Sequence, residues 1–300
     1  MDRLQAMKTF VTVVDTGGFT PAARKLDVSL SVVSRVITEL ETHLGVRLLT
    51  RTTRLVRPTA TGATYYENCR RILAEIEEAE LATTGAHAAP RGKLSITASV
   101  LFGRRFVTPI VVEYLRRYPE VDAECLLIDR NVNFVEEGID VGVRIGPLPS
   151  SSLQAIPVGR VRRVVCAAPD YLARFGTPAT PDDLAHHTVI QTTGISTLPE
   201  WRFMRDGETA PTRLTPRLAT STNDSAIGAA VAGFGLAAVL SYQIADEVRD
   251  GKLRIVLDTF EQPPLPIHVI HREGRHAMHK VRAFIDLAVD TLRGTASLNP

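Results

Sequence analysis

The chain has 300 residues, of which 44% are hydrophobic and 23% are charged, and its formal net charge at pH 7 is only +2. This composition is typical of a soluble globular protein, and the length predicts two or three domains rather than one core. The sequence predicts neither a membrane span nor a disulfide framework, because no run of eighteen apolar residues occurs and Cys69, Cys125 and Cys166 lie far apart.

The first twenty residues predict an amphipathic helix. Leu4, Met7, Phe10, Val11 and Val14 recur at helical spacing and form one face. Acidic and polar side chains stand where a secretory signal would have its apolar core. Together with the dispersed cysteines, this start predicts a cytoplasmic protein in a reducing compartment.

Residues 20–57 predict a helix-turn-helix followed by a basic arm. Thr20 before Pro21 is typical of a helix start, and residues 27–29 break that helix. A second helix is expected over about residues 31–44. Its inner stripe consists of apolar side chains at helical spacing, namely Val32, Val33, Val36, Ile37, Leu40 and Leu44. Two helices joined by a three-residue turn are typical of a DNA-binding segment.

The outer face of the second helix carries short or cationic side chains, which can approach bases and phosphates without filling the groove. Residues 1–60 hold nine basic and five acidic side chains, whereas the remaining 240 residues hold 26 and 28. The positive charge is therefore concentrated in the segment that would meet DNA. The DNA contacts expected from this segment are Thr20, Arg24, Ser29, Ser31, Ser34, Arg35 and Thr38.

The basic arm predicts a short hairpin, the wing of a winged helix-turn-helix. Residues 47–57 contain four arginines and no carboxylate, and the arginines alternate with apolar side chains. One side of the hairpin would pack on the helices while the arginines lie along the phosphates, with contacts from Arg51, Thr52 and Arg54. The alternative is an ordinary solvated basic loop.

An uninterrupted helix is predicted from about residue 59 to 84, a rod of about 39 Å at the usual rise per residue. Its apolar side chains follow steps of four and three, which is typical of a coiled-coil seam. The seam consists of Tyr65, Cys69, Ile72, Ile76 and Ala79. We expect this seam to pair with a second copy of the chain; the alternative is a helix lying on the neighbouring domain. Residues 85–92 have the composition of a linker.

Strands and helices alternate from residue 93 onward, which predicts an α/β unit with largely parallel sheets. Strands are expected at 94–98, 123–128, 140–144, 163–168, 188–191, 217–220, 236–240, 252–257 and 267–271. Helices are expected near 103–117, 131–137, 169–174, 223–232, 241–249 and 277–292. This many strands predicts two lobes, with a crossing near residues 160–163, a return near 263–264 and a ligand cleft between them.

Several segments in the same order resemble the LysR-type bacterial transcriptional regulators over the whole chain. They are FVTVVDTGGFTPAARKLDVS, VSRVITELETHLGVRLLTRTTR, YPEV, DVGVRIG and NDSAIGAAVAGFGLAAVL. The resemblance implies a winged helix-turn-helix, a dimerising linker helix and a two-lobed effector domain like a periplasmic binding protein. It further implies a dimer of dimers on promoter DNA, in which a small-molecule effector changes DNA bending and contact with RNA polymerase. The sequence leaves the effector open, and carboxylates and aromatics are the candidates to screen.

With this resemblance, the chain is expected to divide into three parts. Residues 1–58 form the DNA-binding domain, 59–90 the linker helix and hinge, and 91–300 the effector domain. Lobe I would take about 91–161 and 266–300, and lobe II about 162–265.

The chain departs from the family pattern in the recognition helix and after the wing. Leu30 stands where the family commonly has Gln or Pro, and Val32 stands where it commonly has Ala. A leucine cannot donate a hydrogen bond to a base edge but can touch a thymine methyl group. The wing ends in VRPTATG where LTxxG is usual, which affects where the linker helix begins.

The effector site is expected where strands end and helices begin in the two lobes. The turn after the first strand matches the effector-contacting turn of the family, and exposed amides there would suit a carboxylate. Arg144 is a candidate counter-charge, and hydroxyls or amides follow two strands of the second lobe. The full set is Ser99, Val100, Leu101, Arg144, Thr192, Thr193, Ser221 and Asn223. The alternative for each hydroxyl is a helix cap, a role that Asn223 could also take.

Other functions are less well supported by the sequence. An enzyme on the same lobes would need a nucleophile with a base, and GxSxG, GxxxxGK[ST] and HExxH are all absent. A solute-binding protein would need an export signal. His186, His187, His271, His276 and His279 lack a nearby cysteine and do not predict a zinc site. We therefore expect no catalysis, no metal and no cofactor.

Overall fold

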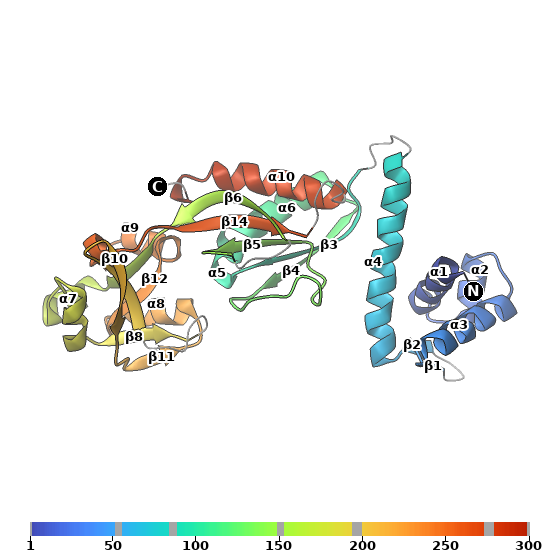
Figure 1. Cartoon of the computed structure of the whole chain (residues 1–300), viewed down its shortest axis with the longest axis horizontal. Coiled ribbons are helices and arrows are strands. Elements are labelled where there is room, and N and C mark those ends of the chain that lie inside the picture. The colour runs from blue at the N-terminus through green and yellow to red at the C-terminus, as the bar shows by residue number, and fades with distance from the viewer. Residues whose placement is uncertain are drawn as a thin grey trace. The chain divides into compact units, whose positions relative to one another are not determined.

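The computed structural model of the chain describes residues 2–51, 56–83, 89–148, 153–193, 200–272 and 279–298. The chain forms two compact units, Met1–Ala88 and Ala89–Pro300 (Figure 1). Within the described ranges, no helix is both long enough and apolar enough to cross a membrane.

The N-terminal unit is a winged helix-turn-helix continued by one long helix, as the sequence predicts. Its strands β1 and β2 pair antiparallel, with Thr50 opposite Arg57. The elements are α1 (Arg3–Asp15), α2 (Phe19–Lys25), α3 (Leu30–Leu44), β1 (Leu49–Arg51), β2 (Val56–Pro58) and α4 (Ala60–Thr83).

Local side-chain chemistry sets the ends of these helices. The Ser29 hydroxyl accepts a hydrogen bond from the Val32 amide (3.4 Å) at the start of α3, and Gly45 ends α3 in the left-handed region at φ 68°. The prediction that Thr20 caps α2 is wrong, because α2 begins at Phe19 after an extended Gly18. Pro21 is tolerated in the first turn of α2 because the first amides of a helix have no intrahelical acceptor.

The buried face of α1 differs from the predicted one. Ala6, Phe10 and Val13 are fully buried, whereas the predicted Leu4 is 40% exposed. Two threonines can share the buried face because their hydroxyls donate to the carbonyl four residues earlier, as Thr9 does to Gln5 at 2.7 Å. In α3 the predicted Leu44 is likewise exposed, since it lies in the last turn beyond the core.

Helix α4 is fixed to the winged helix by close backbone contact. The Thr59 amide donates to the Leu48 carbonyl (2.9 Å), and the Thr59 hydroxyl accepts from the Gly62 amide (2.9 Å). A Cβ atom on Gly62 would stand 1.9 Å from the Leu48 carbonyl oxygen. Only glycine lets the first turn of α4 approach the wing this closely.

Two residues of the predicted dimer seam make their packing contacts within the same chain. Cys69 is fully buried in the core of the N-terminal unit, and Tyr65 packs on Phe10 with ring centroids 5.5 Å apart. Both residues therefore join α4 to α1 within one chain, and their part in a dimer seam stays a prediction. Ile72 and Ile76 are half-buried, and the Ala79 side chain lies outside the described residues.

The C-terminal unit contains two five-stranded sheets, one in each lobe (Figure 1). Lobe I has strand order β4-β3-β5-β14-β6, formed by β3 (Gly92–Ala98), β4 (Val121–Leu127), β5 (Val141–Ile145), β6 (Gln154–Val161) and β14 (Leu265–His271). Its helical segments are α5 (Val100–Phe102), the π-helical η1 (Gly103–Val107), α6 (Thr108–Arg117), α10 (His279–Arg293) and η5 (Ala296–Leu298).

Lobe II has strand order β11-β8-β12-β7-β13 and a separate hairpin of β9 and β10. The strands are β7 (Arg163–Ala167), β8 (Val189–Thr192), β9 (Glu200–Arg205), β10 (Glu208–Arg213), β11 (Leu218–Thr220), β12 (Leu236–Leu240) and β13 (Arg254–Val256). The helical segments are α7 (Pro169–Phe175), η2 (Pro181–His186), α8 (Asn223–Val231), η3 (Ser241–Ile244), α9 (Ala245–Arg249) and η4 (Asp258–Phe260).

The sheets are mixed rather than largely parallel. In lobe I β3 is parallel to β4 and β5, but β14 is antiparallel to both β5 and β6. In lobe II β12 is parallel to β8 and antiparallel to β7. Each antiparallel pair in these two sheets includes β7 or β14, the strands that follow the two passages of the chain between the lobes.

Some elements were not predicted correctly from the sequence. β6 contains Pro157 and Gly159, which mask a strand pattern, and the hairpin β9–β10 is rich in charged and polar side chains. The predicted helix at 131–137 is a series of turns, in which the Asn133 side chain accepts from the Val135 amide (3.1 Å).

The two passages of the chain between the lobes lie side by side. β6 ends at Val161 and pairs with β14, whose first residue Leu265 is opposite Val161. Arg162 stands between β6 and β7, and its guanidinium lies 3.3 Å from the Glu261 carboxylate. The Ser241 amide donates to the Arg162 carbonyl (2.9 Å), which ties η3 to the same point.

The tight approach of α4 to the wing predicts opposite effects for alanine at two helical glycines. Gly62→Ala should lower the free energy of unfolding by about 2 kcal/mol, because the new Cβ meets a backbone oxygen. Gly228→Ala in α8 should raise it by up to about 1 kcal/mol, since nothing lies within 4 Å of that position. Thermal unfolding of the intact variants checks this pair, and equal midpoints would contradict the packing described for α4.

Candidate DNA-contacting face and ligand cavity

Helix α3 presents one polar face to solvent. Ser31, Arg35 and Thr38 follow helical spacing and are exposed, whereas Val33 and Ile37 on the opposite face are fully buried. The burial of one face therefore fixes which side chains the other face offers. Ser34 is half-buried at the edge of this face.

The hydrogen-bonding states of these side chains differ. The hydroxyl oxygens of Ser29 and Ser31 are 2.8 Å apart, and the Thr38 hydroxyl donates to the Ser34 carbonyl (2.9 Å). Within the described ranges, Arg24 and Arg35 are exposed and make no hydrogen bond or ion pair. Their guanidinium donors are therefore available to phosphates or bases.

Two apolar side chains stand at the start of α3. Leu30 is 49% exposed and Val28 is 37% exposed. Leu30 is the first residue of α3, and the first residues of a recognition helix are those that meet base edges. The helix thus offers an apolar surface beside the hydroxyl pair.

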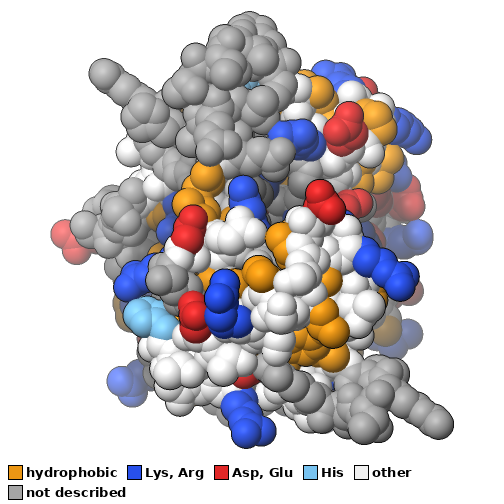
Figure 2. All heavy atoms as spheres, turned by 90° about the vertical axis from the view of Figure 1, so that its right-hand side faces the viewer, with side chains coloured by type: hydrophobic (Ala, Val, Ile, Leu, Met, Phe, Trp, Pro, Cys, Tyr) orange, Lys and Arg blue, Asp and Glu red, His pale blue; other side chains and the backbone are white. Residues whose placement is uncertain are grey.

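The described basic side chains of the N-terminal unit do not form one continuous patch on the face shown in Figure 2. Figure 2 views the N-terminal unit from its α1–α3 side, where Lys and Arg side chains lie apart from one another among acidic, apolar and uncharged ones. The backbone of Arg51 lies in β1, while its side chain and the predicted contacts Thr52 and Arg54 lie outside the described residues.

A cavity of about 250 Å³ lies in the C-terminal unit and is lined from both sheets. Lobe I contributes residues that follow β3 and β4 and the end of β5, while lobe II contributes β8, β9, β12 and the start of α8. Arg163 and Leu265, next to the two chain passages, also line it. This is the place between lobes where the sequence predicts a ligand site.

The cavity brings together four of the eight predicted effector residues, namely Ser99, Arg144, Thr192 and Asn223. Asn223 is the first residue of α8, whose cap position is Thr222, so its side chain is not used as the helix cap.

The other four predicted effector residues do not line the cavity. The Val100 amide donates to the Asp129 carboxylate (3.1 Å) and Leu101 packs on the hydrophobic cores. The Thr193 hydroxyl donates to the Thr220 carbonyl (3.2 Å), and Ser221 is exposed before α8. Their contact with an effector stays a prediction that this cavity does not support.

Two aromatic side chains that sequence reasoning missed form part of the wall. The Trp201 indole donates to the Gln191 side-chain oxygen (3.0 Å). Tyr242 of lobe II packs edge-to-face on Phe102 of lobe I, with ring centroids 5.3 Å apart. Burial raises the pKa of Tyr242 to about 12, so its hydroxyl stays protonated at neutral pH.

The charged side chains that line the cavity differ in their partners: among the described residues, some form ion pairs, and others do not. Arg130 makes two short contacts with the Glu137 carboxylate (2.8 and 2.7 Å), and Glu200 accepts from Arg202 (3.2 Å). The Arg144 guanidinium donates to the Thr97 hydroxyl (3.1 Å). Burial lowers the pKa of Arg144, against the opposing effect of nearby carboxylates.

Arg163 differs from the other cations. It borders the cavity with more than a third of its surface open to solvent, yet it makes no hydrogen bond or ion pair with the described residues. Burial by the surrounding lobes lowers the pKa of Arg163. The sequence placed residue 163 at the crossing between lobes, which is the only signal that could have identified it.

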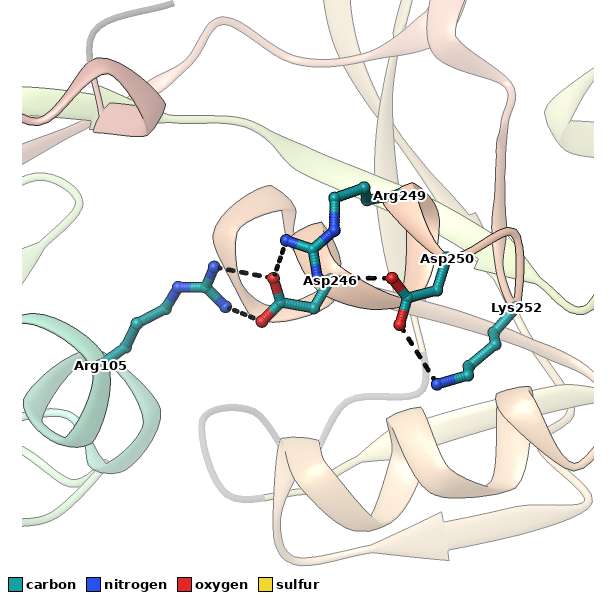
Figure 3. A network of polar contacts seen from close by, with 5 residues as sticks. All are labelled: Arg105, Asp246, Arg249, Asp250 and Lys252. Carbon is teal, nitrogen blue, oxygen red and sulfur yellow. Dashed lines mark hydrogen bonds and ion pairs between the residues drawn. The ribbon is translucent and has the colours of Figure 1, made fainter.

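An ion-pair network joins the lobes close to the aromatic contact (Figure 3). Arg105 of η1 binds the Asp246 carboxylate of α9 with two contacts of 2.8 and 3.3 Å, and Arg249 adds a third (2.8 Å). The chain of contacts continues through Asp250 to Lys252. The Arg105 guanidinium lowers the pKa of Asp246, so this link is present at neutral pH.

The described residues contain no group of three or more His, Cys, Asp or Glu side chains placed to hold a metal ion.

Comparison with known proteins matches both units of the chain. Residues 4–63 match the family described as bacterial regulatory helix-turn-helix protein, lysR family, and residues 87–293 match the LysR substrate binding domain. A transcriptional repressor of Pseudomonas aeruginosa is 35% identical over 294 residues, which cover 97% of this chain and 92% of the relative. The transcriptional activator AaeR of Escherichia coli is 32% identical over 293 residues, covering 97% and 94%.

A solved structure extends this similarity to three dimensions. CrgA, a LysR-type transcriptional regulator from Neisseria meningitidis, aligns over 97% of this chain and 99% of its own with a TM-score of 0.62 and 29% identity.

Proposed function

This chain belongs to the LysR family of bacterial transcriptional regulators, and from that premise we propose how its residues do the work of a DNA-binding regulator with an effector-binding domain. Helix α3 reads promoter DNA, and a small molecule in the cavity between the lobes changes that binding. The observation that carries the proposal is the exposed face of Ser31, Arg35 and Thr38 on a helix whose other face is buried. The chain acts by binding alone, without catalysis.

The DNA contacts divide into two kinds. Ser31 and Arg35 meet base edges in the major groove, where an arginine pairs best with guanine. Arg24 in the last turn of α2 meets phosphates and positions the helix, together with Arg51 and Arg54, the contacts predicted from the sequence. The first kind sets sequence preference, and the second sets affinity for any sequence.

The salt dependence of binding tests the proposed function. In a mobility-shift assay with the intergenic DNA upstream of its own gene, the chain should bind at low salt and weaken progressively as salt rises, because phosphate contacts release counterions. Arg51→Ala should weaken binding to all sequences alike. Absence of binding at low salt, or affinity that salt leaves unchanged, would count against a regulator.

Leu30 gives a sharper test of how α3 reads bases. We propose that it touches a thymine methyl group, which is supported by its 49% exposure at the first position of α3. Replacing single thymines of the bound site by deoxyuridine removes one methyl group each time. At one position this should weaken binding about fourfold, the value of one buried methylene of about 0.8 kcal/mol.

The matched control for this test lies on the same helix. Leu30→Ala should abolish the sensitivity to deoxyuridine, whereas Leu44→Ala, an exposed leucine at the far end of α3, should keep it. Equal sensitivity in both variants would show that another side chain contacts the methyl group.

The effector proposed for the cavity is a small carboxylate or aromatic compound. The cavity combines arginine side chains with aromatic and amide groups, which suits a ligand with an anionic end and an apolar body. Trp201 is the single tryptophan of the chain and lines this cavity. Its fluorescence therefore reports on ligand binding without a label.

Binding of an effector should change the emission of Trp201 and saturate with one site per chain. Gln191→Leu, which removes the acceptor of the indole N–H at 3.0 Å, should shift the emission of the free protein as well. A ligand that alters DNA binding but leaves Trp201 emission unchanged would place the effector elsewhere.

We propose further that the regulator works in the cytoplasm as a dimer of dimers and contacts RNA polymerase at the promoter. Ile72 and Ile76 of α4 are half-buried and lie beyond the turns that pack on α1, so part of their apolar surface is left open. This open apolar surface supports pairing of α4 with a second copy of the chain.

Ile76→Glu should therefore lower the oligomeric state measured by analytical ultracentrifugation, because a charge cannot be buried in an apolar seam. Asn68→Glu, at an exposed position of the same helix, is the matched control and should leave it unchanged. An unaltered assembly in Ile76→Glu would refute this position in the interface.

A further inference from the structure

We infer that the effector carries a single anionic group and that Arg163, at the passage between the lobes, is the residue that binds it. This inference rests on the proposed function of the cavity and names the chemical class of its ligand. It also moves the counter-charge away from Arg144, the residue that the sequence suggests.

The position of Arg163 places a cation at the base of the cavity. Arg163 is the first residue of β7, two residues after β6 ends at Val161. Its neighbour in β12, Leu240, also lines the cavity, as does Leu265 at the start of the return strand. A ligand at this point therefore touches both lobes at the segments where they join.

The neighbouring Arg162, unlike Arg163, is paired with a carboxylate among the described residues. Arg162 lies 3.3 and 3.4 Å from the two Glu261 oxygens. Glu261 also borders a side cavity of about 20 Å³ next to Arg163, but no hydrogen bond or ion pair joins those two among the described residues. Arg163 is thus a partly desolvated guanidinium whose donors bind no partner among the described residues, which is the arrangement that a carboxylate completes.

The other charges of the cavity are already balanced. Arg130 is bound by Glu137, and Glu200 is bound by Arg202. Arg144 donates to the Thr97 hydroxyl, and the Asp129 carboxylate lies in the same wall and stabilises its charge. Among the described residues that line the cavity, one uncompensated positive charge remains, and it favours a ligand with one negative charge over a ligand with two.

The rest of the ligand would lie among uncharged groups. Trp201 and Tyr242 offer aromatic surface, while Gln243 and Asn223 offer amide groups at the same cavity. A monocarboxylate with a planar or compact apolar body fits this combination, because the apolar body gains burial while the charge meets Arg163.

The experiment compares benzoate, its neutral isostere benzamide and the dianion phthalate on the intact chain at constant ionic strength. Binding is followed by Trp201 emission and by the thermal unfolding midpoint, which a ligand of the folded state raises. Benzoate should bind, and benzamide and phthalate should each bind at least tenfold more weakly. Equal binding of benzamide would overturn the anionic class, and tighter binding of phthalate would overturn the single charge.

Variants test which residue binds the anion. Arg163→Gln should weaken benzoate binding at least tenfold, and Arg163→Lys, which keeps the charge without the bidentate donors, should recover part of it. Arg160→Gln removes the same charge from an exposed side chain outside the cavity and should bind benzoate as the parent does. If Arg144→Gln abolishes binding while Arg163→Gln does not, the assignment to Arg163 is wrong.

DNA binding separates this inference from the proposed function. Arg163→Gln lies outside the DNA-contacting unit and should retain the affinity of the parent for the upstream intergenic DNA in the absence of ligand. If no compound of the three binds a chain that still binds this DNA, the anion site is refuted and the regulator stands. If the parent chain fails to bind DNA, the proposed function itself fails.

Discussion

The ligand cavity depends on one constraint, which is that the chain passes between its two sheets at adjoining segments. Val161 and Leu265 are opposite each other in a β-ladder, and the Arg162–Glu261 ion pair reinforces that junction. The packing of Tyr242 on Phe102 and the contact of Arg105 with Asp246 join the lobes a second time. With the lobes held at two places, the space between them keeps a defined set of walls.

In the N-terminal unit, packing of the core likewise determines which side chains are presented to a ligand. The buried stripe of α3 decides that Ser31, Arg35 and Thr38 face outward, so the surface that we propose for DNA recognition is a consequence of core packing. The Glu41 carboxylate accepts from the amides of Leu48 (2.8 Å) and Leu49 (3.0 Å), which ties α3 to the wing. A rigid presentation of this kind lowers the entropy cost of docking in the major groove.

The sequence allowed the fold to be predicted better than the site. Periodicity and turn chemistry located the three N-terminal helices, the long α4 and nine of the strands, because these signals are local. β6 was missed because proline and glycine interrupt it, and the burial of Cys69 against α1 could not be separated from a dimer seam by spacing alone. Arg163 and Trp201 reach the cavity only through pairing of distant strands, and no local pattern encodes that.

In the proposed function, occupancy of the cavity changes the affinity of the same chain for DNA. The most direct measurement of this coupling is the reciprocal one: the Kd of a carboxylate from Trp201 emission with and without saturating upstream DNA, and the Kd of the DNA with and without saturating carboxylate. Both ratios should differ from one and be equal, because a coupling free energy acts in both directions. Two ratios of one, with both ligands bound, would show that cavity and recognition helix are independent and would contradict the proposed coupling.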